Sequence, residues 1–371
     1  MTRGAAMPVE DASVLARPKV SVHMITYNHA PYIRQALDSV LMQKRDFPIE
    51  ICLGEDQSTD GTREICQEYA ARYPGLIRLF LRDRADPARK QYASPIMHNL
   101  VETLKACRGE YVAFLEGDDY WTDPDKLRLQ AEFLGVHPGH SMCFHRIAVL
   151  NQDTGVLAPV DPGHHGDTVG IGAACVRGIH TSSALIRRAA LSQPPWGRTH
   201  LLSADYSLFF MAARRGAIGY LDRQMSVYRH HGSGVYTSRS GAARFRAAKR
   251  MFRFLRPLAP VSEQILVDDA LALYALDSVK QCARKGLLGE TLLSAWRCCG
   301  AIPPRRFALW RRLAGLVGAA FVQWGLAVAE QNTPHSLASY RLAKERLAVV
   351  SLRLRRPFGR RREAHVSGGC H

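Results

Sequence analysis

The sequence predicts an α/β fold with a mostly parallel central sheet, followed by a mainly helical C-terminal addition. Through the first half, short β-rich runs alternate with helical patterns, which is the order expected of repeated βαβ units. The 371 residues are 47% hydrophobic, enough to bury a sizeable core. The net charge of +17 lies almost entirely in the second half, which marks that half as a separate region.

The charge distribution sets the predicted domain boundary. Residues 1–237 carry 26 Lys and Arg against 25 Asp and Glu, whereas residues 238–371 carry 24 against 8. A near-neutral first half suits a catalytic domain, and a basic second half suits contact with an anionic partner. The predicted regions are a disordered lead-in at 1–18, a catalytic domain at 19–237, a basic helical region at 238–350 and a polybasic disordered tail at 351–371.

The elements of the first half follow from the period of their apolar residues. In chain order, they are strand 19–26, helix 32–42, strand 49–53, helix 61–72, strand 76–81, helix 96–106, strand 110–115 and helix 124–134. Farther on, 141–150 reads as a strand and 180–186 returns to strand character. Between them, 154–172 is rich in Gly, Pro and His and is predicted to be a long functional loop.

Acidic residues directly follow the buried strand 110–115. Glu116, Asp118 and Asp119 would lie at the carboxyl end of this strand, where open α/β sheets bind their ligands. Hard carboxylate ligands at such an edge suit Mg²⁺ or Mn²⁺ that holds a diphosphate. We therefore expect a metal-assisted nucleotide-sugar site here.

Two further turns are expected at the same sheet edge. Thr26, Tyr27 and Asn28 end the first strand, and the run 54–62 ends the second. Backbone and hydroxyl groups of the first turn could line a base pocket with Tyr27 against the ring, while Asp56 could accept the imide N–H of uracil or thymine. A purely structural reading is open for each turn alone, since its residues are also ordinary turn and helix-cap residues.

Four ordered blocks together resemble the family 2 glycosyltransferases of the GT-A fold. The blocks are Val20-Ser21-Val22 with Thr26-Tyr27-Asn28, the run 55–62, Gly109-Glu110-Tyr111, and Phe114 to Asp119. The resemblance runs from about Lys19 to about Tyr236. Glu55 stands where the family commonly has aspartate, and Glu116-Gly117 stands where Asp-Ser or Asp-Ala is frequent; both departures keep a carboxylate.

The resemblance implies roles for individual residues. Thr26, Tyr27 and Asp56 would hold the nucleobase, and Asn99 would sit near the nucleotide. Asp118 would lie against the ribose or the metal, and Asp119 would be the principal ligand of a divalent ion that bridges the diphosphate. A UDP- or dTDP-type sugar is the favoured donor, and the acceptor would be a glycan, a lipid-linked glycan or a small molecule of surface polysaccharide, lipopolysaccharide or other glycoconjugate synthesis.

Two later residues complete the implied site. Asp205 opens a helical pattern, where an acid can serve simply as a cap, but the family places its general base here, which implies single displacement with inversion. His231 matches a histidine that returns toward the metal or the diphosphate. Because alternate residues of a strand face opposite ways, at most one of His230 and His231 is expected to point into the site.

The sequence of the second half fits two alternatives. One is a helix that contacts anionic lipid, and the other is a helix that packs on its own domain. Basic and apolar residues alternate at helical spacing from Arg244 to Arg256, which suits either a membrane-surface helix or a helix with a solvated basic face. Nine cysteines without metal or disulfide spacing, and a start without the features of a secretory signal, favour a cytoplasmic protein. Peripheral attachment to the inner face of the plasma membrane stays open.

Two other functions compete with glycosyl transfer. A nucleotidyltransferase that forms sugar nucleotides also needs a metal-bound nucleotide, but the glycine-rich basic loop expected after its first strand is absent from 26–29. A non-catalytic protein could use the basic half to bind nucleic acid. Because the basic and aromatic residues match no recognised nucleic-acid module, no nucleic-acid partner is expected.

Overall fold

The structure is a computed structural model that describes residues 17–92, 94–160, 167–169, 179–191, 204–232 and 241–284, together with 292, 295, 311 and 313–317. The predicted tail at 351–371 and nearly all of the predicted lead-in lie outside these residues. The described chain divides into two compact units, the first ending at Tyr274 and the second beginning at Ala275.

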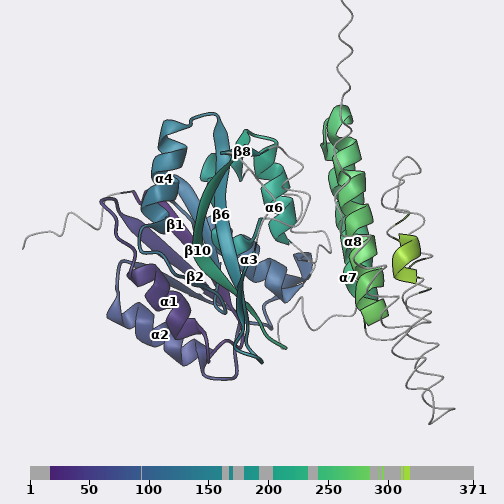
Figure 1. The fold of residues 1–371 in the computed structure, drawn as a ribbon. Coiled ribbons are helices and arrows are strands. Elements are labelled where there is room, and N and C mark those ends of the chain that lie inside the picture. Colours follow the sequence, from purple (N-terminus) through teal and green to yellow (C-terminus); the bar gives the residue numbers. More distant parts are fainter. Residues whose placement is uncertain are drawn as a thin grey trace, which may run out of the picture. The chain divides into compact units, whose positions relative to one another are not determined.

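A single sheet organises the first unit (Figure 1). Its path runs β3-β2-β1-β4-β9-β6-β10-β5, while β7 pairs with β6 and β8 pairs with β10. The strands are β1 (Val20–Thr26), β2 (Ile49–Glu55), β3 (Ile77–Leu81), β4 (Tyr111–Glu116), β5 (Tyr120–Trp121), β6 (His140–Asn151), β7 (Leu157–Pro159), β8 (Thr168–Val169), β9 (Leu185–Arg187) and β10 (Ala217–His230). The first four form a parallel block, which confirms the predicted topology.

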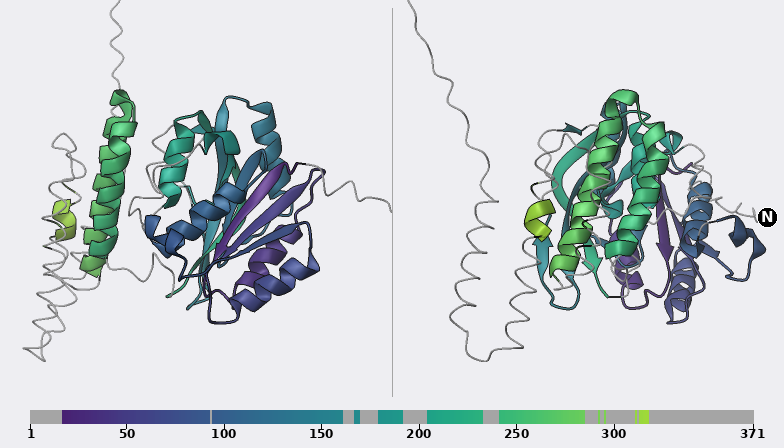
Figure 2. Two further views of the ribbon diagram at one scale, coloured as in Figure 1. Left: turned by 180° about the vertical axis from the view of Figure 1, so that it is seen from behind. Right: turned by 90° about the vertical axis from the view of Figure 1, so that its right-hand side faces the viewer.

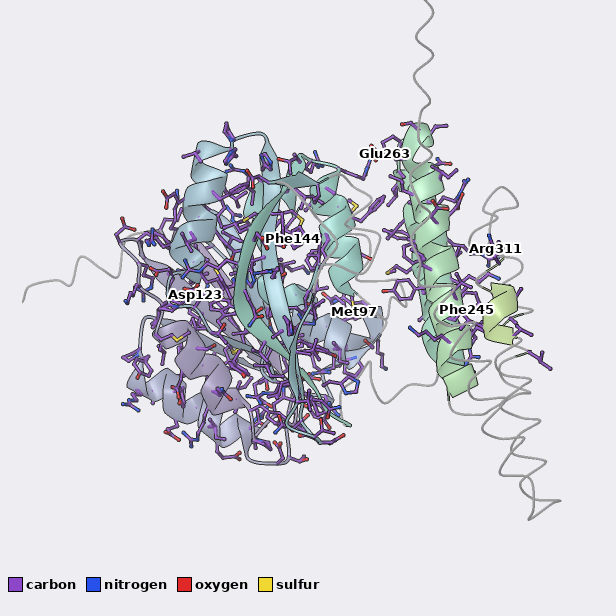
Figure 3. The ribbon with its side chains drawn as sticks, viewed as in Figure 1. Met97, Asp123, Phe144, Phe245, Glu263 and Arg311 are labelled. Atoms are coloured by element: carbon purple, nitrogen blue, oxygen red, sulfur yellow. The ribbon has the colours of Figure 1, made fainter. Side chains whose placement is uncertain are left out.

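Helices cover both faces of the sheet (Figures 1 and 2). They are α1 (Ile33–Leu41), α2 (Thr62–Arg72), α3 (Pro95–Ala106), α4 (Lys126–Val136) and α6 (Ala204–Ala213), each near the bounds that apolar periodicity predicts where it predicts one. Alternate residues of β4 enter two different cores. Val112 and Phe114 pack with α3 and α6 in a cluster that includes Met97 of α3 and Phe144 of β6 (Figure 3), whereas Ala113 packs with α1, α2 and α4.

The register of the parallel block brings three strand ends together. Thr26 is opposite Glu55 in β2, and Ile25 is opposite Glu116 in β4. The segments that follow these strands therefore leave the sheet side by side. This is the edge at which the sequence places the nucleotide and metal residues.

Two predicted segments differ from the structure. The predicted loop 154–172 contains β7 and β8, whose two or three residues are too few to show an alternating pattern. The predicted strand 180–186 begins instead with a short 3₁₀ turn, η3 (Thr181–Ser183), and only Leu185 to Arg187 pair as β9. The His180 side chain accepts a hydrogen bond from the Ser182 N–H, and this local bond turns the backbone before it can enter the sheet.

The basic region begins with helix α7 (Gly241–Leu255), whose apolar side is buried in the first unit. Phe245, Met251 and Phe252 are at most 4% exposed, and Met251 and Phe252 belong to the same core cluster as Phe144. Helix α8 (Gln264–Arg284) follows. Within the described chain, no helix combines the length and the apolar character that crossing a membrane requires.

Candidate active site

The turns after β1 and β2 hold each other at the carboxyl edge of the sheet. The Asp56 N–H donates to the Thr26 carbonyl at 3.1 Å. Asn28 donates its N–H to Ser58 Oγ at 2.9 Å, and its own Oδ1 accepts from the Thr59 N–H at 3.0 Å. Asn28 has a left-handed φ of 54°, which asparagine tolerates better than most residues. The predicted convergence of the two turns is confirmed.

Tyr27 and Asp56 are joined by arginines that the sequence pattern did not single out. The Arg84 guanidinium carbon lies 3.8 Å from the centroid of the Tyr27 ring, and Arg84 Nη2 lies 3.4 Å from Asp56 Oδ2. Arg89 donates to the other oxygen of Asp56, which is 2% exposed. The sequence position of Arg84 could have indicated this contact. Arg84 comes shortly after the third parallel strand, β3, and therefore emerges at the same edge of the sheet. A planar ring, a carboxylate and a guanidinium together suit recognition of a nucleobase.

Asn99, in helix α3, holds the end of β2 in place through a hydrogen bond. Its Nδ2 donates to the Gly54 carbonyl at 2.9 Å, its Oδ1 accepts from Arg82 and Thr103, and its side chain is buried. A Cβ on Gly54 would approach Asn99 Oδ1 to 2.2 Å, so only glycine fits at this crossing. Any effect of Asn99 on a nucleotide would therefore pass through the position of the strand end.

Asp118 lies between two histidines. His231 Nε2 is 3.0 Å from Asp118 Oδ2, and His29 Nε2 is 3.7 Å from the same oxygen. Burial pushes the pKa of Asp118 upward, but the His29 charge and the hydrogen bond from His231 outweigh burial and leave the pKa below its usual value. His230 is exposed whereas His231 is 5% exposed, so His231 is the one of the pair that faces the site.

Asp119 is the more deeply buried member of the acidic pair. It is 1% exposed, its Oδ1 accepts the backbone N–H of Arg229 at 2.9 Å, and its Oδ2 lies 3.9 Å from His180 Nδ1. Burial raises the pKa of Asp119 well above its usual value, and the charges of Asp118 and Glu116 raise it further. Burial also lowers the pKa of His180 to about 4, so this ring is neutral near pH 7.

The acidic pair suits a divalent cation. Two adjacent carboxylates, one half-buried and one buried, repel each other, and a hard cation beside them would remove that repulsion while using their oxygens as ligands. His231 adds an imidazole beside Asp118. In the described part of the chain, however, no three His, Cys, Asp or Glu side chains gather closely enough to form a metal site by themselves. A cation here would need oxygen ligands from a diphosphate or from solvent.

Arg229 fixes the end of β10, which His231 directly follows. Its guanidinium lies 5.1 Å from the Tyr32 ring centroid and 4.7 Å from that of Tyr120, and it donates to Gln35 and Gln152. Arg229 thus ties the end of β10 to α1. Its guanidinium therefore contacts two aromatic rings and two side-chain amides.

Asp205 lies at the second position of α6, as the predicted helix start requires. Its side chain is outside the described residues, so the geometry of the implied base stays a prediction. In the sheet, β6 lies between β9 and β10, and α6 contacts β6.

Gly117 permits the turn between β4 and the acidic pair. A Cβ built at this position would lie 2.5 Å from Thr26 Oγ1 and 2.7 Å from Thr26 Cβ. We expect Gly117→Ala to lower the free energy of unfolding by about 2 kcal/mol, because the Thr26 backbone and Asp118 must shift apart. Urea unfolding measures the change. Gly135→Ala is the control, since a Cβ on that α4 glycine meets nothing within 4 Å and should cost no stability; equal behaviour of the two variants would contradict the steric account.

Comparisons with known proteins agree with this fold. Residues 21–191 match the family model described as Glycosyl transferase family 2. The chain is 37% identical over 222 residues to an uncharacterized protein of Mycobacterium tuberculosis, covering 59% of this chain and 61% of that relative, so it spans about three fifths of the relative's length. It is 36% identical over 118 residues to the putative teichuronic acid biosynthesis glycosyltransferase TuaG of Bacillus subtilis, covering 32% of this chain and 42% of TuaG.

Solved structures show the same architecture. A crystal structure of S. aureus TarS, residues 1-349 in complex with UDP-GlcNAc, aligns with a TM-score of 0.58 at 20% identity and covers 85% of this chain and 92% of that one. At this identity the likeness concerns the fold alone. Together with the family match, it identifies residues 21–191 as part of a glycosyl transferase family 2 domain with the GT-A fold.

Proposed function

We propose that this protein is a metal-dependent, inverting glycosyltransferase that moves a sugar from a nucleoside-diphosphate sugar to an acceptor hydroxyl. The observation that carries the proposal is the acidic pair of half-buried Asp118 and buried Asp119, located where the turns after β1 and β2 emerge and joined to His231 and the Arg229 N–H. The TuaG similarity supports an acceptor of envelope polysaccharide or glycoconjugate synthesis.

The residues of the site divide the work of binding. Tyr27, Asp56 and Arg84 would hold the base, and a UDP- or dTDP-type donor is favoured because Asp56 can accept an imide N–H while Arg84 can donate to a ring carbonyl. Asp118 and Asp119, with His231 beside them, would hold Mg²⁺ or Mn²⁺. When bound, the ion offsets the negative charge that develops on the departing nucleoside diphosphate.

A panel of sugar nucleotides tests the proposal. The purified protein is incubated with UDP-, dTDP-, GDP- and ADP-linked sugars plus Mn²⁺, Mg²⁺ or EDTA, and release of the nucleoside diphosphate is followed. We expect slow, metal-dependent release from one base class and none with EDTA. Absence of release and of nucleoside-diphosphate binding across the whole panel would refute the proposal.

Asp205→Asn is expected to keep affinity for the nucleoside diphosphate and to lower the transfer rate by about 10²–10⁴-fold, because the amide cannot take the acceptor proton. Calorimetry gives the affinity and single-turnover transfer gives the rate. Asp46→Asn is a matched control, since Asp46 is exposed at the opposite end of β2. Undiminished transfer by the Asp205 variant would remove this residue as the base.

The basic face of α7 would hold the protein on an anionic membrane surface. Arg246, Arg250 and Arg253 follow one another at spacings of four and three and are exposed, while the apolar side of the helix is buried in its own domain. Attachment would therefore be electrostatic and would not require the apolar side to insert. It would keep a cytoplasmic enzyme at the inner face of the plasma membrane.

Vesicle flotation tests this attachment. With 30% phosphatidylglycerol at low salt, we expect wild-type protein to float, and changing Arg246, Arg250 and Arg253 to Gln to weaken binding by roughly 100-fold, at about 1 kcal/mol per charge. Changing exposed Lys44, Arg45 and Arg72 to Gln removes the same charge elsewhere. If both triple variants lost equal binding, overall charge rather than α7 would be responsible.

A further inference from the structure

We infer that His180 donates a hydrogen bond from its Nε2–H to an oxygen of the substrate held at Asp118 and Asp119, an inference that rests on the proposed function. His180 belongs to none of the sequence blocks that predicted the site. The structure nevertheless places its ring beside Asp119. His180 directly precedes the turn η3, which contributes no other residue to the site described above.

The backbone around His180 is held from several sides. The Ser182 carbonyl accepts from Trp121 Nε1 at 2.9 Å, and Ser182 Oγ lies 3.1 Å from Ser226 Oγ in β10. The next carbonyl, that of Ser183, accepts from Gln130 in α4 at 2.8 Å. Ser182 and Ser183 are fully buried. The turn η3 is therefore a rigid support, and a side chain on it can be placed with the accuracy that substrate contact needs.

The hydrogen bonds of the ring determine which nitrogen is available. His180 Nδ1 accepts the Ser182 N–H at 3.4 Å and lies 3.1 Å from Ser182 Oγ, a hydroxyl that can donate to the same nitrogen. Because a backbone amide can only donate, we assign the acceptor role to Nδ1 and the proton of the neutral ring to Nε2. Within the described part of the chain, Nε2 makes no hydrogen bond. The side chain is 25% exposed, so a ligand can reach it.

The ring of His180 lies beside Asp119 and Tyr228. His180 Nδ1 is 3.9 Å from Asp119 Oδ2, and the ring centroid is 4.3 Å from that of Tyr228 in β10. Asp118 already has His29 and His231 beside it, whereas Asp119 has only the Arg229 N–H and this ring among the contacts above. Nε2–H is separated from Nδ1 only by Cε1 of the ring, so it can reach an oxygen of a substrate bound next to Asp119, which a phosphate of the donor or a hydroxyl of a bound sugar could supply.

Two isosteric substitutions separate the functions of the two nitrogens. Asparagine can replace Nδ1 but does not reach the position of Nε2, whereas glutamine can place an amide N–H near Nε2 without reproducing the bond at Nδ1. Both remove the ring contact with Tyr228 equally. We expect His180→Asn to lower kcat/KM for transfer by at least 10-fold and His180→Gln to retain activity within about 3-fold of wild type.

The readouts distinguish the two oxygen sources. Weaker binding of UDP with Mn²⁺ in the Asn variant, measured by calorimetry without acceptor, assigns the contact to the diphosphate. Unchanged UDP affinity with a higher KM for the acceptor, or lower donor hydrolysis, assigns it to a sugar hydroxyl. His137→Asn, at an exposed histidine at the end of α4, is the matched control and should behave as wild type.

Two outcomes would overturn the inference while the proposed function stands. If His180→Asn matches wild type in every readout, Nε2 contacts no substrate. If His180→Gln is as impaired as His180→Asn, the ring acts only by packing or through Ser182 and Asp119. The proposed function fails separately, when wild-type protein neither binds nor turns over any sugar nucleotide.

Discussion

Asp119→Asn is expected to abolish metal-dependent turnover and, at the same time, to make the protein more stable at neutral pH. The asparagine Oδ1 can still accept the Arg229 N–H, so the fold keeps this bond. Its amide carries no charge, and the repulsion from Asp118 and Glu116 that raises the pKa of Asp119 disappears. We expect a gain of about 1–3 kcal/mol in the free energy of unfolding and a fall in turnover of at least about 10³-fold.

The pH dependence of this gain has a definite sign. Because the folded-state pKa of Asp119 lies above its unfolded value, its protonated form contributes stability that is present at low pH and is lost as pH rises through the folded-state pKa. The variant should therefore exceed wild type at pH 7, and the two should converge as pH falls toward the usual aspartate pKa. Urea unfolding at several pH values measures the difference.

A second buried aspartate gives the matched control. Asp123 is 7% exposed, but it pairs with Arg223 and accepts the Asp125 N–H (Figure 3). Asp123→Asn removes an attractive partner and should lower stability. Adding Mn²⁺ and UDP should stabilise wild type and the Asp123 variant but not the Asp119 variant. Equal stabilisation of all three by the ligands would contradict the metal role of Asp119.

The residues at the carboxyl edge of the sheet could be predicted because each strand is recognisable from its own short stretch of sequence. Apolar periods mark β1, β2 and β4, and parallel topology then requires their carboxyl ends to meet, so Thr26, Asp56 and Asp118 are brought together without knowledge of any side-chain contact. Because alternate residues of a strand face opposite ways, the sequence also predicted that at most one of His230 and His231 points into the site. In the structure that residue is His231.

Contacts that depend on side-chain reach could not be predicted. Glu55 illustrates this, since its longer side chain curls back to accept the Ser58 N–H at 2.6 Å and also pairs with Arg63. The carboxylate therefore holds the turn that presents Asp56. Arg84 and His180 come from segments distant in sequence, and no local pattern relates them to Tyr27 or Asp119.

Lys126 is a more extreme case, because sequence alone would place a helix lysine at the surface. Its Nζ is fully buried, 4.0 Å from the Trp121 ring centroid and 2.7 Å from Gln130 Oε1. Burial lowers the pKa of Lys126 from 10.5 to about 7. That difference corresponds to roughly 5 kcal/mol of penalty on the charged form in the folded state.

Lys126→Met is therefore expected to raise the free energy of unfolding at pH 6 to 7. Methionine keeps the contact with Trp121 and fills a similar volume, but it leaves Gln130 Oε1 without its donor and removes the cation from the ring, losses of about 1–2 kcal/mol each. Since these losses are smaller than the penalty of the buried charge, we expect a net gain of about 1–3 kcal/mol.

The wild-type protein should itself become more stable as pH rises from 7 toward 10.5. In that window the unfolded lysine still binds a proton that the folded lysine has released, so unfolding free energy increases with pH, and the advantage of the methionine variant shrinks. Burial also raises the pKa of the Cys66 and Cys143 thiols to about 12, which lowers stability above pH 9 in both proteins. The difference in unfolding free energy between wild type and variant from pH 6 to 9 therefore isolates Lys126.

Exposed Lys44 gives the control. Lys44→Met should leave the slope of unfolding free energy against pH unchanged. Parallel curves of unfolding free energy against pH for wild type and Lys126→Met would show that the buried amine does not titrate in this range.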